Sequence, residues 1–158
     1  FLVRSHGMSL QGAGIVMGLI GGVFAALGAL TSGWLSDRLG KRKVFVIVAS
    51  LIMGVSFIIP IVAPTVVGMF AFAVIFGLGY GIYLSVDAAL MTEVLPAAES
   101  AGKDLGILNI ATTLPQALTP VIVWAFIALT GSYTTIFAAG IVFAVAGALS
   151  VLPIRSVR

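Results

Sequence analysis

The side chains that could bind a solute or take part in proton transfer lie inside long apolar stretches of this sequence. Asp87 is the only formally charged residue within those stretches, and Phe76, Tyr80 and Tyr83 precede it. Counted from Phe76, these residues fall at offsets of 0, 4, 7 and 11, which places them on one face of a helix. Such a face indicates either a wet cavity, because buried hydroxyls need partners, or an aromatic stripe in core or lipid contact. Asp87 would lie roughly 6–8 Å below the membrane surface, a depth that favours a structural or gating partner over a deep proton site.

A second polar face lies further along the chain. At 100° per residue, an arc of about 120° holds Asn109, Thr112, Thr113, Gln116 and Thr119. Gln116 would lie about 16 Å from the start of its helix, near the middle of a bilayer. An amide there is costly unless it is hydrogen-bonded, whereas threonine hydroxyls can bond back to their own helix. Asn109 and Gln116 are therefore the main candidates for solute binding, and Thr112, Tyr80 and Tyr83 are further ones.

Proline and small residues predict where these helices bend and pack. Pro115 and Pro120 flank Gln116, and since each removes a backbone hydrogen bond, we expect a kink or a loosened turn there. Glycine and alanine recur at helix-packing spacing, which lets backbones approach closely in lipid. The two expected packing ridges are Gly14, Gly18, Gly22 and Ala26 in the first stretch, and Gly140, Ala144 and Ala148 in the last. Gly77 and Gly81 are expected to pack on a neighbouring helix.

A cluster of charges separates the first two apolar stretches. The eleven residues Gly33–Lys43 hold four basic residues and one acid, five of the thirteen formal charges in the chain. Two glycines within the cluster favour a tight turn. Such a turn cannot lie in hydrocarbon, so it must lie at a membrane surface.

Composition places most of the chain in lipid. Of 158 residues, 61% are hydrophobic and 8% are charged, against roughly a quarter charged in soluble domains. The apolar runs are long and do not alternate, so helices are predicted in place of a barrel. The net charge of +3 comes from loops and not from a basic helix face, which argues against nucleic-acid binding. There is no cysteine, His6 is the single histidine, and no catalytic arrangement is visible, so neither an enzyme, a metal site nor a cofactor is expected.

Five membrane spans are predicted, and the basic residues orient them. Most Lys and Arg fall in the first turn, near Lys103 and at the C-terminus, and the opposite side has only Arg4. The positive-inside rule therefore puts the first turn and the C-terminus in the cytoplasm, in a multi-pass protein of the cell (inner) membrane. The expected spans are Gly12–Leu35, Val44–Pro64, Val67–Met91, Leu105–Thr130 and Thr134–Pro153.

The charged turn carries a family resemblance. Its pattern of Gly33, Asp37, Arg38 and Gly40 followed by Lys41, Arg42 and Lys43 resembles the loop signature of the major facilitator superfamily, which occurs between helices 2 and 3 and again between helices 8 and 9. Three further expected helices after the turn match the second copy. The resemblance implies that residues 1–158 are a partial C-terminal domain, from the end of helix 7 to helix 12. This domain would form most of the six-helix C-terminal bundle of a twelve-helix carrier. Because the chain begins Phe1-Leu2-Val3 without Met, we expect the N-terminal half to be missing.

The same resemblance implies a gating role for the turn. In the family, the acid at the position of Asp37 accepts hydrogen bonds from the N-terminus of helix 11, here near Asp104–Gly106, in the outward-facing state. The base at Lys41 pairs with an acid near the end of helix 10, for which Asp87 and Glu93 are the candidates. Gly33, Arg38 and Gly40 complete this gating set. Arg42 and Lys43 are interpreted as orientation charges alone.

A shorter resemblance bears on the solute. Residues 104–111 with Leu114, Pro115 and Gln116 look like helix 11 of the glycoside and sucrose carriers of the superfamily. The expected function is secondary transport of a small solute by alternating access, as a sugar/H+ symporter. The alternative is a non-transporting sensor or scaffold of the same fold, which would need neither the gating set nor the polar face. Expected partners are the solute, H+, the lipid bilayer and the missing half of the carrier.

Overall fold

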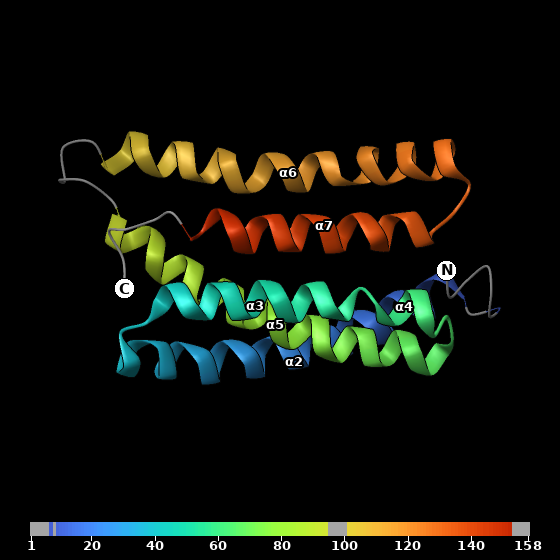
Figure 1. The fold of residues 1–158 in the computed structure, drawn as a ribbon, viewed down its shortest axis with the longest axis horizontal. Helices are drawn as coiled ribbons and strands as arrows, with labels where there is room; N and C mark the ends of the chain where they lie inside the picture. Colours follow the sequence, from blue (N-terminus) through green and yellow to red (C-terminus); the bar gives the residue numbers. More distant parts are fainter. Residues whose placement is uncertain (1–6, 8, 95–100, 153–158) are drawn as a thin grey trace.

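The structure is a computed structural model that describes residue 7 and residues 9–94 and 101–152. Within those ranges the chain forms helices and no strands. Figure 1 shows the long helices running roughly along one common direction. The helices are α2 (Leu10–Leu39), α3 (Arg42–Ser56), the short α4 (Ile59–Val62), α5 (Val66–Val94), α6 (Ala101–Thr130) and α7 (Thr134–Ser150).

The predicted all-α membrane class is confirmed. Four segments are long and apolar enough to cross a membrane: Gln11–Leu39, Arg42–Val62, Val66–Asp87 and Gly106–Thr130. α7 is apolar but has only 17 residues. At 1.5 Å per residue it is about 25 Å long, somewhat less than a typical hydrocarbon core of ~30 Å.

The turn between α2 and α3 is shorter than the sequence suggested. α2 continues through Asp37 and Arg38 to Leu39, and Gly40 ends it in the left-handed region with φ of +59°. The Gly40 amide donates to the carbonyl of Ser36 at 2.9 Å, which caps the helix. α3 begins at Arg42, so two residues reverse the chain. The charged side chains therefore lie on helix ends whose backbone fixes their positions.

The second expected span is interrupted near its end. Pro60 has no amide hydrogen to donate to the carbonyl of Ser56, and α3 stops at that residue. Phe57 and Ile58 form a turn, and α4 follows with Pro60 in its first turn. By contrast, α6 continues as one helix through Pro115 and Pro120.

α2 and α5 pack through small residues, with their backbones in direct contact. A Cβ built on Gly77 would lie 2.5 Å from the carbonyl oxygen of Gly21, and one on Gly81 would overlap the backbone of Ala25. The predicted packing role of Gly77 and Gly81 is therefore confirmed. Close approach of this kind replaces hydrophobic association in lipid.

The two predicted ridges fare differently. In α7 the ridge is confirmed, because Gly140 packs on the Phe57 ring and Ala144 contacts Gly54 of α3. In α2 no described residue packs against Gly14, Gly18 or Gly22, so the ridge predicted there stays a prediction. The contact with α5 is made by Gly21, Ala25 and Gly28, on another side of the same helix.

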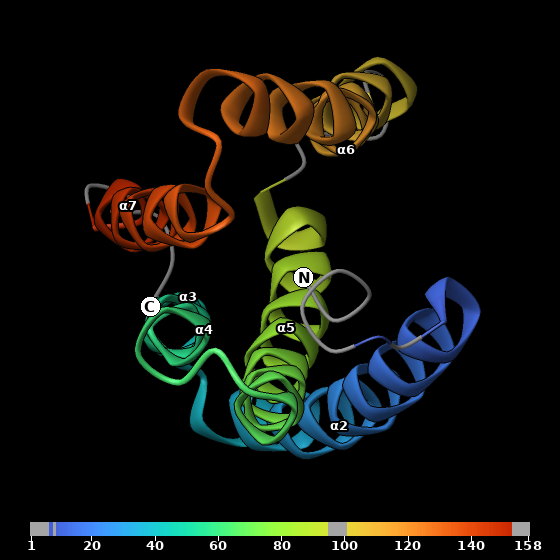
Figure 2. The same cartoon turned by 90° about the vertical axis from the view of Figure 1, so that its right-hand side faces the viewer.

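α6 is the outlying helix. Figure 2 shows α5 in the centre, α2 and α3 against it, and α6 on the far side next to α7. α6 packs mainly on α7, and no residue of its membrane-crossing segment is fully buried. α3 joins the two parts of the bundle, because it packs against both α5 and α7.

Candidate functional site

The acid of the turn is paired within the turn. A carboxylate oxygen of Asp37 lies 2.9 Å from a guanidinium nitrogen of Arg42. Arg42 has 21% of its side chain exposed and Asp37 has 63%, so the pair lies at the surface. Surface pairs of this kind contribute about 0–1 kcal/mol to stability. Arg42 therefore has a partner that the sequence did not predict, in addition to its orientation charge.

The neighbouring base joins two helices. The ammonium of Lys43 donates a hydrogen bond to the carbonyl oxygen of Leu152, which lies just beyond the end of α7. Consecutive residues at the start of α3 therefore reach in two directions, Arg42 to α2 and Lys43 to the end of α7. The interpretation of Arg42 and Lys43 as orientation charges alone is incomplete.

Arg38 and Gly33 also make contacts of their own. The Arg38 guanidinium lies 5.2 Å from the centre of the Trp34 ring, in a cation–π arrangement. A Cβ built on Gly33 would lie 2.8 Å from the hydroxyl oxygen of Ser85 on α5. Gly33 therefore lets α2 approach α5 near the end of α2 at Leu39.

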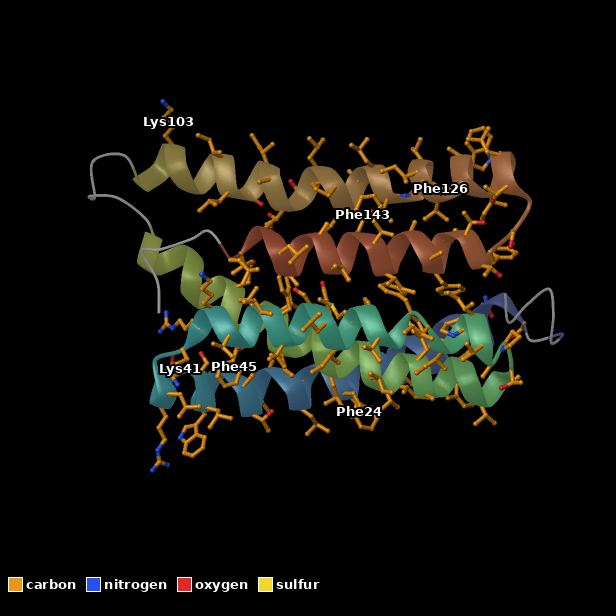
Figure 3. The ribbon with its side chains drawn as sticks, viewed as in Figure 1. Phe24, Lys41, Phe45, Lys103, Phe126 and Phe143 are labelled. Atoms are coloured by element: carbon orange, nitrogen blue, oxygen red, sulfur yellow. The ribbon has the colours of Figure 1, made fainter. Side chains whose placement is uncertain are left out.

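The predicted gating partners remain a prediction. α2 does not pack against α6 in the described ranges, and Asp37 is engaged with Arg42. Lys41 is exposed and forms no ion pair with Asp87 in the part of the chain that is described. The side chains of Glu93 and Asp104 lie outside the described residues. Figure 3 places Lys41 and Lys103 at the same end of the bundle, where the first turn lies.

The aromatic face of α5 points into the bundle. The rings of Phe76 and Tyr80 are stacked, with centroids 6.0 Å apart and planes 10° apart. Phe72 and Phe76 also contact Phe57, which follows α3, and Phe72 contacts Phe137 of α7. This face of α5 therefore lies on the side of α7. Tyr83 lies one turn and Asp87 two turns beyond Tyr80, and these two half-buried side chains are close enough to interact.

The polar residues of α6 divide into two groups. The hydroxyls of Thr112, Thr113 and Thr119 donate to carbonyls of their own helix, at 2.7 to 3.2 Å. These hydroxyl hydrogens are therefore already donated to the helix backbone, as the sequence analysis allowed for threonine. The amide side chains of Asn109 and Gln116 are exposed. The structure does not bring them into contact with Tyr80 or Tyr83, because α5 and α6 are not packed together.

The amides do not lie on the packing face of α6. Leu118, Ile122 and Phe126 face α7 and line an apolar cavity of about 610 Å³. Figure 3 shows Phe126 and Phe143 on the two helices that border it. A step of six residues turns a helix by 600°, so Gln116 lies about 120° around α6 from Ile122. The amides therefore lie on a flank of the helix, where a further partner is required.

A second hollow lies between α2 and α5, and we call it the α2–α5 groove. Its volume is about 420 Å³. Met17, Gly18, Gly21 and Gly22 line it from α2, and Phe72, Phe76 and Tyr80 line it from α5. The sequence predicted Phe76 and Tyr80 on one face but gave no signal that glycines of α2 would lie opposite them. No group of acids and histidines in the described ranges could hold a metal ion.

Comparison with known proteins agrees with the geometry. A family model described as Major Facilitator Superfamily matches residues 1–157. A probable sulfoacetate transporter of Cupriavidus necator is 30% identical over 82% of this chain and 30% of its own length. An arabinose-proton symporter of Bacillus subtilis is 35% identical over 62% of the chain and 21% of its own length. A niacin transporter of Acinetobacter baylyi is 40% identical over 49% of the chain and 18% of its own length. The chain thus spans less than a third of these relatives, and no solved structure matches it.

Proposed function

Because this chain belongs to the major facilitator superfamily, we propose that it is part of a transporter that moves a small solute across a membrane by alternating access. The chain spans 30% or less of its curated relatives, so the proposal concerns a longer protein that contains it. In that protein the chain would contribute part of the C-terminal half. The remaining half would complete the solute-binding cavity. We place the protein in the cell (inner) membrane with its C-terminus in the cytoplasm.

The observation that carries this proposal is the exposure of amides on a membrane-crossing helix. Asn109 and Gln116 are exposed on α6, within the segment Gly106–Thr130. An amide that faces lipid costs several kcal/mol, because nothing in hydrocarbon can bond to it. Such side chains instead face a cavity or another part of the protein. A solute-binding cavity near the middle of the membrane meets this requirement.

We propose that the solute is a sugar and that protons drive its uptake. Amides and tyrosine hydroxyls donate and accept hydrogen bonds without a charge, which suits the hydroxyl groups of a neutral sugar. The arabinose-proton symporter among the relatives supports this choice. Gln116, Asn109 and Tyr80 would contact the sugar, with Thr112 and Tyr83 beside them. Asp37, Lys41 and Glu93, with Asp87, would act in closing the cytoplasmic side.

Uptake into liposomes tests the proposal. The longer protein is reconstituted, a pH gradient is imposed, and uptake is measured for labelled arabinose, niacin and sulfoacetate. We expect accumulation of the sugar that collapses when the gradient is dissipated. If niacin or sulfoacetate accumulates in place of arabinose, the proposal of a transporter stands and the proposal of a sugar as its solute is excluded. If no solute accumulates while a fluorescent reporter confirms folded protein, the alternative of a sensor or scaffold is favoured.

A further inference from the structure

The α2–α5 groove differs in chemistry from the amide flank of α6. Of the residues that line the groove, Tyr80 alone carries a polar side-chain atom. No lining side chain is charged. The groove can therefore bury an apolar surface but cannot satisfy several hydroxyl groups of a bare sugar. Its volume of about 420 Å³ falls within the range of small-molecule sites.

The two walls of the groove favour a flat occupant. On one side the rings of Phe76 and Tyr80 are nearly parallel, 10° apart, in an offset stack. On the other side Gly18 and Gly22 have no atom within 4 Å of the place where a Cβ would be, so their backbone is open to the groove. Between the walls, Gly21 and Gly77 touch through their backbones and close the floor. A ring that enters can extend the aromatic stack and lie against the glycine backbone.

Tyr80 connects the groove with the polar residues of α5. Tyr80 is 39% exposed and carries the hydroxyl that the other lining residues lack. Tyr83 and Asp87 follow on the same face of α5, towards the end where Gly33 meets Ser85. One face of α5 therefore presents an apolar ring site followed by hydrogen-bonding groups. A solute that matches both must itself be apolar at one end and polar at the other.

We propose that the α2–α5 groove binds the aromatic ring of an aryl glycoside, so that a sugar bearing an apolar ring is bound in preference to the same sugar without one. This inference rests on the proposed function for the sugar part of the solute. The ring would stack on Tyr80 and Phe76 and contact the backbone at Gly18 and Gly22. The sugar hydroxyls would bind the polar residues proposed above to contact the sugar, such as Asn109 and Gln116.

The test compares phenyl β-D-glucoside with methyl β-D-glucoside, which share a sugar and differ in the ring. Dissociation constants are measured calorimetrically on the longer protein in detergent. We expect the phenyl compound to bind about tenfold more tightly, because burial of an apolar ring favours it. Gly22→Leu fills the groove and should abolish this preference. Gly14→Leu is the matched control, since Gly14 also faces open space on α2 but does not line the groove.

A second pair of variants separates the ring of Tyr80 from its hydroxyl. Tyr80→Phe should keep the preference for the phenyl compound, and Tyr80→Leu should reduce it at least severalfold. Equal binding of the two glucosides, or a preference that survives Gly22→Leu, overturns the proposal. Sugar uptake in liposomes without a preference for the phenyl compound would overturn the groove assignment and leave the proposed function standing. Binding of the phenyl compound that depends on Gly22, without uptake, would support the groove and count against transport.

Discussion

The ion pair of Asp37 and Arg42 follows from the place where each helix ends. α2 carries Asp37 in its last turn, and α3 begins with Arg42, so a turn of two residues brings the side chains together. The sequence analysis paired Asp37 with the N-terminus of helix 11 and Lys41 with Asp87 or Glu93, which stay predictions, and it did not predict the pair of Asp37 and Arg42. The spacing could not decide between neighbouring bases, because one residue of shift in the start of α3 changes which side chain points back to α2.

We predict that the pair matters for conformational change and not for stability. Asp37→Asn and Arg42→Gln should each change the free energy of unfolding by no more than about 1 kcal/mol, because the acid is largely exposed. Both should slow solute exchange across liposomes while the dissociation constant of the solute stays the same. Thermal unfolding, equilibrium binding and exchange rates are compared on the same preparations. A loss of binding with exchange intact would contradict a gating role.

A separate prediction concerns the exposed amide of α6. Gln116→Leu should weaken solute binding roughly tenfold or more, because an unsatisfied hydrogen-bonding partner costs about 1–3 kcal/mol. Binding and uptake are measured at matched surface expression. Val121→Ala is the control, because Val121 is 62% exposed on the same helix and lies outside the polar arc. If the Gln116→Leu variant binds the solute as tightly as the unchanged protein, Gln116 is not part of the solute-binding site.

Among the helices, the seam between α2 and α5 is the closest contact in the described part of the chain. Gly77 and Gly81 were correctly predicted to pack, since small residues four apart share one face. The face of α2 that meets α5 was not predicted, because glycines occur on several sides of that helix and spacing alone does not identify the side that packs against α5. The break before Pro60 follows from a feature that the sequence shows, the missing amide hydrogen of that proline. α6 is continuous through Pro115 and Pro120, and the kink or loosened turn expected there stays a prediction.

We predict that the seam tolerates no side chain larger than hydrogen at its centre. Gly81→Ala should lower the stability of the folded protein by about 1–3 kcal/mol, because the added Cβ meets the backbone of Ala25 and the backbone cannot move aside as a side chain would. Gly14→Ala should have no such cost, since its site is open and alanine is the better helix former. Thermal unfolding in detergent compares the two. Equal stability of both variants would show that the helices can separate at this seam.

For the molecule as a whole, the all-α membrane class could be derived from composition and from the length of the apolar runs. The candidate site could be derived only in part. Periodicity identified the aromatic face of α5 and the amide flank of α6, because each is a property of one helix. The α2–α5 groove could not be derived, because it depends on which helices lie side by side.

The orientation of the whole bundle is open to direct measurement. These 158 residues contain no cysteine, so a cysteine introduced among them is the only one in this part of the protein. We predict that a membrane-impermeant maleimide added outside intact cells labels Thr65→Cys and Ser132→Cys but does not label Lys41→Cys. The reason is that Lys41 lies at the end of the bundle that carries the basic turn, and basic loops stay in the cytoplasm. After the cells are disrupted, the maleimide should also label the Lys41→Cys variant. Labelling of that variant in intact cells would show that the orientation is the opposite of the one proposed.

The backbone contact between α2 and α5 also has a consequence for biosynthesis. The ribosome completes α2 before α5, and α5, which packs against the glycines of α2, emerges only after α3 and α4 have been made. α2 must therefore wait in the bilayer, or beside the insertion machinery, with its glycine backbone uncovered by its later neighbour. We expect nascent chains arrested before Val66 to hold α2 without this neighbour, in a form that a protease cleaves more readily than the finished protein.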